Sequence, residues 1–184
     1  GAASGYPFVI YSDAYSHKEY LTGISTSSLC GILWTPEARS ARSDREWLNR
    51  MQTVCFSAMA QLNAWSSGKK PWSYDGVTDA VREVIQLRMR LLPYLYSAFA
   101  DYQRFGIPPL RAMILEDGFS GSNDTVIEGR LDSETNPYAM GQRIEKTDQY
   151  MFGRSILVAP FYEDQATVRT VQLPKGNWYD FYSG

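Results

Sequence analysis

Residues 8–13 read Phe8-Val9-Ile10-Tyr11-Ser12-Asp13, an apolar run that ends in a single carboxylate. A run of this kind favours a buried strand, so Asp13 is expected where the strand meets a loop at its carboxyl end. Proteins of the α/β class keep their chemistry at that end of their parallel strands. Position alone makes Asp13 a candidate catalytic carboxyl group, although a turn or cap is the commoner role of an isolated Asp.

A second carboxylate follows a second predicted strand. Residues 30–35 form another short apolar run, after which Glu37 appears. Between the two runs, Ser16 and Glu19 have the spacing of a capping box, which predicts a helix reaching about residue 27. The two carboxylates therefore lie one strand–helix unit apart.

Two more helices and a third strand follow. The spacing of apolar residues predicts helices over residues 43–60 and 78–105, the second of them stopped by Gly106. Pro93 is expected to kink or split the longer helix. Residues 110–115 then read as a strand, so the order of elements is typical of a parallel sheet with crossover helices.

The pattern changes in the last part of the chain. Residues 120–148 are rich in Gly, Ser, Asn, Asp and Thr and predict a long surface excursion. Beyond it, strands with no helix between them are predicted over residues 155–160, 167–174 and 176–182. We therefore divide the chain into a barrel part, residues 1–149, and the start of an antiparallel β domain, residues 150–184.

Composition excludes several classes of function. The 184 residues are 44% hydrophobic and carry a net charge of −2, with no basic stripe of the kind that binds nucleic acid. No apolar run approaches the roughly 20 residues that cross a membrane. His17 is the single histidine, and Cys30 and Cys55 are expected to be buried thiols, so neither a zinc site nor a Ser-His-Asp triad can be assembled. We expect no metal or cofactor, and the cellular compartment stays open.

Three motifs in the same order resemble glycoside hydrolase family 31. Residues 87–96, Leu-Arg-Met-Arg-Leu-Leu-Pro-Tyr-Leu-Tyr, are similar to the family's helix ending in LPYLY, and residues 153–160 are similar to its G-x-x-LLVAP strand. Residues 173–181 resemble its LPxGxWYD hairpin. The resemblance spans essentially the whole chain. It implies an α/β fold, the C-terminal portion of a (β/α)8 TIM barrel followed by the first strands of an antiparallel β-sandwich domain.

The resemblance also implies roles for individual residues. Asp13 stands where the family has its acid/base carboxylate, with Ser12 in place of a Gly. Residues 34–37 match a Trp-x-x-Asp motif, and residues 56–63 match a Phe-Ser-Pro-x-x-Arg-x-His element, with Gln and Asn replacing the Arg and His. The substrate-binding residues are expected to be Trp34, Glu37, Gln61, Asn63 and Trp65. The replacements argue against the usual α-glucosidase specificity.

The implied reaction is retaining hydrolysis of an α-glycosidic bond in an oligosaccharide or glycoconjugate. The nucleophile would belong to an earlier barrel strand outside this chain, so the expected partners are a carbohydrate and the remainder of the same enzyme, and the chain alone is expected to be inactive. An α-transglycosylase and a non-catalytic carbohydrate-binding homologue are the alternatives. For Glu37, an ion pair with Arg39 or Arg42 is the alternative to substrate binding. For Gln61 and Asn63, the alternative is simple hydrogen bonding within the loop.

Overall fold

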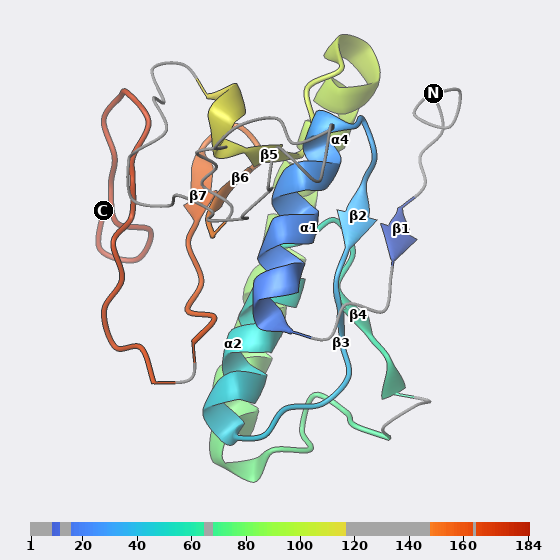
Figure 1. Ribbon diagram of the computed structural model, residues 1–184, viewed down its shortest axis with the longest axis vertical. Helices are drawn as coiled ribbons and strands as arrows, with labels where there is room; N and C mark the ends of the chain where they lie inside the picture. Colours follow the sequence, from blue (N-terminus) through green and yellow to red (C-terminus); the bar gives the residue numbers. More distant parts are fainter. Residues whose placement is uncertain (1–8, 12–15, 65–67, 117–147, 164) are drawn as a thin grey trace, which may run out of the picture.

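The computed structural model describes residues 9–11, 16–64, 68–116, 148–163 and 165–184 (Figure 1). The three long helices are α1 (His17–Leu29), α2 (Asp44–Cys55) and α4 (Thr78–Phe105). The short 3-10 helices are η2 (Asp75–Val77) and η3 (Met113–Leu115). The strands are β1 (Ile10–Tyr11), β2 (Trp34–Thr35), β3 (Glu37–Ala38), β4 (Gln61–Leu62), β5 (Leu110–Ala112), β6 (Tyr150–Phe152) and β7 (Ile156–Val158).

The helix starts follow the capping residues that the sequence predicts. Ser16 and Glu19 form a complete capping box at the start of α1, since each side chain bonds the other residue's backbone N–H. Ser43 caps α2 by accepting from the backbone N–H of Glu46. The carboxylate of Glu46 does not return to Ser43, because it bonds Arg42 and Arg50 instead. Helix α2 ends at Cys55, earlier than the predicted residue 60.

Parallel pairing organises the first half of the chain. Strand β1 pairs in parallel with β2, with Tyr11 opposite Thr35, and β3 pairs in parallel with β4, with Glu37 opposite Gln61. The prediction of parallel strands joined by helices is confirmed here. Strand β4 lies in a segment where the sequence indicated only an ordered loop, and Glu37 lies within a strand rather than in a loop after one.

The third predicted strand does not join the parallel strands. Residues 110–112 form β5, which pairs antiparallel with β6, and β6 pairs antiparallel with β7 in a three-stranded sheet. The prediction of a parallel partner was wrong because strand direction depends on partners distant in sequence. Residues 117–147 lie outside the described part of the chain, and the division at residue 149 stays a prediction.

Two further expectations need correction near the C-terminus and at Cys30. Residues 165–184 contain no strand in the structure, although two were predicted there, and Val168 is 84% exposed. Their alternating pattern finds no paired neighbour among the described residues, and strands are stabilised by pairing. Cys55 is buried as expected, whereas Cys30 is exposed at the end of α1, and both thiols are free.

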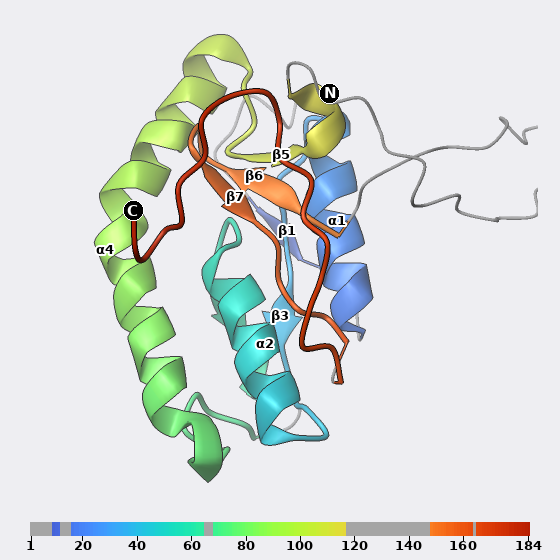
Figure 2. The ribbon, with the colours of Figure 1, turned by 90° about the vertical axis from the view of Figure 1, so that its left-hand side faces the viewer.

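Helix α4 runs along the molecule without being split at Pro93 (Figure 2). Arg88 donates to the carbonyl oxygens of Cys55, Ser57 and Ala58 just beyond α2, at 2.6 to 3.0 Å. Tyr94 donates to the carbonyl oxygen of Phe152 at 2.9 Å. Contacts on both sides of Pro93 therefore hold the helix in one piece. Gly106, at φ 71°, ends it in the left-handed conformation, as predicted.

One hydrophobic core joins the helices and both kinds of sheet. Figure 2 shows α4 and α1 on opposite sides of α2 and the antiparallel sheet. Trp47, Ile24, Val54 and Phe152 are fully buried in this core. In the part of the chain that the structure describes, no helix is both long enough and apolar enough to span a membrane.

Two glycines with the same backbone conformation give a matched test of packing. Gly106 and Gly153 both have positive φ, 71° and 63°, but a Cβ on Gly153 would meet the Tyr94 hydroxyl whereas one on Gly106 would meet nothing within 4 Å. We expect Gly106→Ala to cost about 1 kcal/mol of folding stability and Gly153→Ala about 3 kcal/mol. Thermal unfolding of the intact protein measures both, and equal losses would contradict the steric explanation.

Candidate functional site

Three of the predicted site residues that the structure describes, Glu37, Gln61 and Asn63, lie together at the pairing of β3 with β4. Glu37 begins β3, Gln61 begins β4 directly opposite, and Asn63 follows β4, where its backbone N–H bonds the carbonyl oxygen of Ala38 at 2.9 Å. Three of the predicted substrate-binding residues, far apart in sequence, are thus neighbours.

The carboxylate of Glu37 is the centre of this cluster. Its Oε1 accepts from Asn63 Nδ2 at 2.8 Å and from Arg39 Nε at 2.7 Å, and its Oε2 lies 3.5 Å from Gln61 Nε2. Glu37 is only 2% exposed, whereas the side chain of Arg39 is 20% exposed. The ion pair with Arg39, which the sequence offered as the alternative for Glu37, is therefore present, and it occurs together with the predicted neighbours. A buried carboxylate bound in this way orients the groups around it.

The remaining predicted site residues are placed differently. Trp34 is buried in the hydrophobic core, and its ring packs so closely on Gly23 of α1 that a Cβ there would lie 2.6 Å from it. Asp13 and Trp65 lie outside the described residues, so their roles stay predictions. Trp72, which the sequence analysis did not assign to the site, is 61% exposed, with Lys70 Nζ 6.0 Å from its ring centroid.

A buried polar network behind Glu37 was missed by the sequence analysis. Tyr20 of α1 donates its hydroxyl to the backbone oxygen of Glu37 at 2.7 Å and accepts from Arg50 Nη1 at 3.0 Å. Arg50 of α2 is in turn bound to Glu46 Oε1 through Nε and Nη2, at 3.1 and 2.7 Å. One signal could have found it, because Arg50 lies on the apolar stripe of α2, between Trp47 and Val54, where a charge needs a partner.

A cavity of about 430 Å³ opens beside this network. It is bounded by Arg39 from the Glu37 cluster, by Tyr20 and Arg50, and by Ser16 at the start of α1. The cavity thus joins the candidate site to the N-terminal end of α1, the end that follows β1 along the chain.

Burial and neighbouring charges determine the protonation states around the network. Burial raises the pKa of Tyr20, which keeps its hydroxyl protonated and able to donate. Burial acts to raise the pKa of Glu46 as well, but hydrogen bonds from Arg42 and Arg50 outweigh it and hold this pKa below its usual value. Burial, then the charge of Arg50, lowers the pKa of His17 to about 4, although Glu46 acts in the opposite direction.

No metal site is evident in the described ranges. Within them, no three His, Cys, Asp or Glu side chains are grouped so that they could hold an ion. The side chains at the Glu37 cluster are a carboxylate, amides and a guanidinium group, which form the kind of hydrogen bonds that recognise hydroxyl groups.

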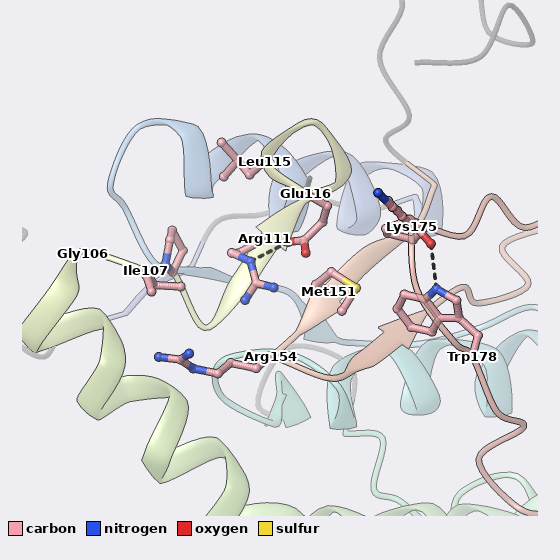
Figure 3. Close-up of a pocket in the computed structure, with 11 residues that line it drawn as sticks. Gly106, Ile107, Arg111, Leu115, Glu116, Met151, Arg154, Lys175 and Trp178 are labelled. Carbon is pink, nitrogen blue, oxygen red and sulfur yellow. Dashed lines mark hydrogen bonds and ion pairs between the residues drawn. The ribbon is translucent and has the colours of Figure 1, made fainter. Parts of the chain in front are cut away.

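A second cavity, of about 580 Å³, lies in the C-terminal half (Figure 3). Arg111 lines it and donates to Glu116 Oε1 at 2.6 Å and to the Gly153 carbonyl oxygen at 2.8 Å. Trp178 lies across Met151 from Arg111, and its indole N–H donates to the Pro174 carbonyl oxygen at 2.8 Å. No lining residue is shared with the Glu37 cluster, so this cavity is a separate feature.

Two pairs of parallel strands joined by helices are followed by a small antiparallel sheet. This is the arrangement expected of part of a (β/α)8 barrel followed by a β domain. The profile of the glycosyl hydrolases family 31 TIM-barrel domain matches residues 9–98, and that of the glycosyl hydrolase family 31 C-terminal domain matches residues 106–184. The chain belongs to glycosyl hydrolase family 31.

Curated relatives carry several activities. The chain is 29% identical to an isomaltosyltransferase of Sporosarcina globispora, over 72% of this chain and 12% of that protein. It is 31% identical to an alpha-glucosidase of Saccharolobus solfataricus over 60% of this chain and 13% of that protein, and 28% identical to an alpha-xylosidase of Emericella nidulans over 68% and 14%. This chain therefore spans only about an eighth of the length of the relatives.

Solved structures agree on the fold. The cycloalternan-degrading enzyme from Trueperella pyogenes in complex with a covalent intermediate superposes with a TM-score of 0.71 at 23% identity, over 98% of this chain and 25% of that one. A GH31 alpha-xylosidase from a soil metagenome complexed with xylose gives 0.64 at 20% identity, over 91% and 27%. At these identities the likeness establishes the fold alone.

The lowered pKa of His17 predicts acid sensitivity of folding. His17 takes up a proton near pH 6.5 in the unfolded chain but only near pH 4 in the folded chain. The free energy of unfolding is therefore unaffected by protonation of His17 above pH 6.5 and falls as the pH drops from 6.5 towards 4. The full loss is about 3 kcal/mol. In the intact protein, His17→Gln should flatten the fall in unfolding free energy between pH 7 and pH 4. An unchanged slope would contradict a neutral, buried His17.

Proposed function

We propose that the protein carrying this chain is a retaining α-glycosidase in which Asp13 is the acid/base residue. The observation that carries the proposal is the parallel register of β1 and β2, in which Tyr11 lies opposite Thr35. Asp13 follows Tyr11 by two residues, and Glu37 follows Thr35 by two residues. Since parallel strands carry their chemistry at the carboxyl end, this register favours a position for Asp13, which lies outside the described residues, at the same edge as Glu37. Membership of family 31 supports the same assignment.

The proposed reaction proceeds in two displacements. A carboxylate outside this chain attacks the anomeric carbon while Asp13 gives its proton to the departing glycosidic oxygen, so a glycosyl–enzyme ester forms and the aglycone leaves as an alcohol. Asp13, now ionised, then takes a proton from water, whose oxygen attacks the same carbon and releases the sugar. The configuration is retained because the carbon is inverted twice.

The Glu37 cluster supplies substrate recognition in this proposal. Glu37 is buried and fully engaged, so it acts by orienting Arg39, Gln61 and Asn63, of which Arg39 and Gln61 are partly exposed. Guanidinium and amide groups in fixed orientations bind hydroxyl pairs well. Trp34 supports β2 from the core, and Trp65 is proposed as a stacking platform for a sugar ring.

A transglycosylase is the second candidate function. It is favoured by the similarity to an isomaltosyltransferase. The proposed residues would act identically, and a sugar hydroxyl would replace water in the second displacement. Product analysis with and without an added acceptor sugar separates the two activities.

The acid/base assignment predicts a dependence on the leaving group. In the intact protein, Asp13→Ala should slow hydrolysis of α-glycosides with poor leaving groups by orders of magnitude. The loss should be much smaller on activated aryl α-glycosides, which depart without a proton. The measurement compares both substrate types among α-glucosides, α-galactosides and α-xylosides. Asp79→Ala, an exposed substitution in α4, is the control. Equal losses would reject the assignment, and no turnover by the wild type would favour a non-catalytic homologue.

A recognition role for Glu37 predicts a loss of activity that does not depend on the leaving group. Glu37→Gln keeps the size of the side chain but removes the charge that holds Arg39 and Asn63. We expect kcat/KM to fall about tenfold or more, by the same factor for good and poor leaving groups, since substrate positioning serves both. A loss confined to poor leaving groups would instead mark Glu37 as a proton donor.

A further inference from the structure

A chain of buried hydrogen bonds links two helices to the main chain of the candidate site. From Glu37, it runs through the Tyr20 hydroxyl to the Arg50 guanidinium and on to the Glu46 carboxylate. Glu46 Oε2 accepts in addition from the backbone N–H of Arg42 at 2.7 Å, in the loop between β3 and α2. Strand β3 is thus tied to α1 at Glu37, and the loop that follows it is tied to α2 at Arg42.

Every member of this chain is shielded from water. Tyr20 is 1% exposed, Glu46 6% and Arg50 8%. The guanidinium carbon of Arg50 also lies 5.3 Å from the centroid of the Tyr20 ring, within cation–π distance. A buried ion pair is a poor source of net stability, because desolvation offsets much of the attraction, but it specifies one arrangement of the groups that it joins.

We infer that Tyr20 and Arg50 are positioning residues, which fix the main chain at Glu37 and so set the orientation of the recognition cluster. Glu37 is held at its backbone oxygen by Tyr20 and at its carboxylate by Arg39, Asn63 and Gln61. A shift of β3 would move Glu37 and Arg39 directly, and Asn63 through its backbone bond to Ala38. The inference rests on the proposed function, because it concerns how that site is ordered.

Tyr20 and Arg50 are linked to the candidate site through the main chain of Glu37. Tyr20 donates to the backbone carbonyl oxygen of Glu37, and Arg50 is linked to that oxygen through the Tyr20 hydroxyl. The inference predicts that the effect of either residue on a substrate passes largely through Glu37. This makes the coupling between Tyr20 and Glu37 the quantity to measure, rather than the size of either loss by itself.

A double-mutant cycle in the intact protein tests the inference. Tyr20→Phe removes the hydroxyl and keeps the ring, and Glu37→Gln removes the charge that orders the cluster. We expect each single change to lower kcat/KM on an aryl α-glycoside about tenfold. The kcat/KM of the double variant should lie within about twofold of that of the less active single variant. Losses that multiply to about a hundredfold would show independent effects and overturn the inference, as would an unchanged kcat/KM for Tyr20→Phe.

A matched control separates positioning from general loss of packing. Tyr102 also donates its hydroxyl to a backbone oxygen, that of Gly31, at 2.8 Å, on elements outside the network. Tyr102→Phe should leave kcat/KM within about twofold, even where its melting temperature falls as much as that of Tyr20→Phe. A matching loss of kcat/KM for Tyr102→Phe would overturn the inference.

A second variant tests Arg50 without deleting its charge. Arg50→Lys keeps a cation beside Glu46 but loses the planar fork that reaches Tyr20 at the same time. Its loss of kcat/KM should be non-additive with that of Tyr20→Phe, and additive losses would contradict the chain of contacts. If the wild-type protein cleaves no α-glycoside, both the proposed function and this inference fail. If it does and the cycle is additive, the inference alone fails.

Discussion

The buried carboxylate of Glu37 is the constraint on which the candidate site depends. A carboxylate with 2% exposure needs compensating donors, and here they come from Arg39 on the same segment and from Gln61 and Asn63 on the neighbouring one. The hydrogen bonds that compensate this buried charge therefore join β3 to β4 and to the residue that follows it. They hold two short strands in register that, at two residues each, have little pairing of their own.

A second set of buried charges lies one layer further from the site. Glu46 and Arg50 form an ion pair within α2. The Tyr20 hydroxyl accepts a hydrogen bond from Arg50 and donates one to the backbone oxygen of Glu37, so it links this ion pair to β3. The alternative of filling this space with apolar side chains would often be as stable. Apolar side chains would lack the directionality of the hydrogen bonds that join α1 and α2 to the backbone of Glu37. The polar network is better explained by precision than by stability.

The elements that local chemistry determines were predictable from sequence. The capping box of Ser16 and Glu19 and the glycine stop at Gly106 lie where the pattern indicated, because a cap involves residues within one turn of the chain. The antiparallel pairing of β5 was not predictable, since its partner β6 lies nearly forty residues later. Strand β4 was missed because Gln61 and Leu62 acquire strand geometry only from β3.

The candidate site divides in the same way. Glu37, Gln61 and Asn63 were found through motif resemblance, and the structure brings them together, but the contact of Tyr20 with Arg50 joins helices thirty residues apart and leaves no local pattern. A charged residue on an otherwise apolar helix stripe is the one visible sign. It tells that a partner must exist without telling which residue it is.

Helix α4 explains why the parallel strands and the antiparallel sheet share one core. Pro93 removes a backbone donor, which should weaken the helix at that point. Arg88, five residues before it, holds the carbonyl oxygens that follow α2, and Tyr94, just after it, holds Phe152 and the backbone N–H of Ser155. One half of the helix is thus fixed to the end of α2 and the residues that follow it, and the other half is fixed to the antiparallel sheet, so Pro93 lies between two anchors rather than at a free end. The contacts of Arg88 and Tyr94 hold the helix on both sides of Pro93, and through it the packing of β6 is linked to the end of α2, close to the strand that carries Gln61.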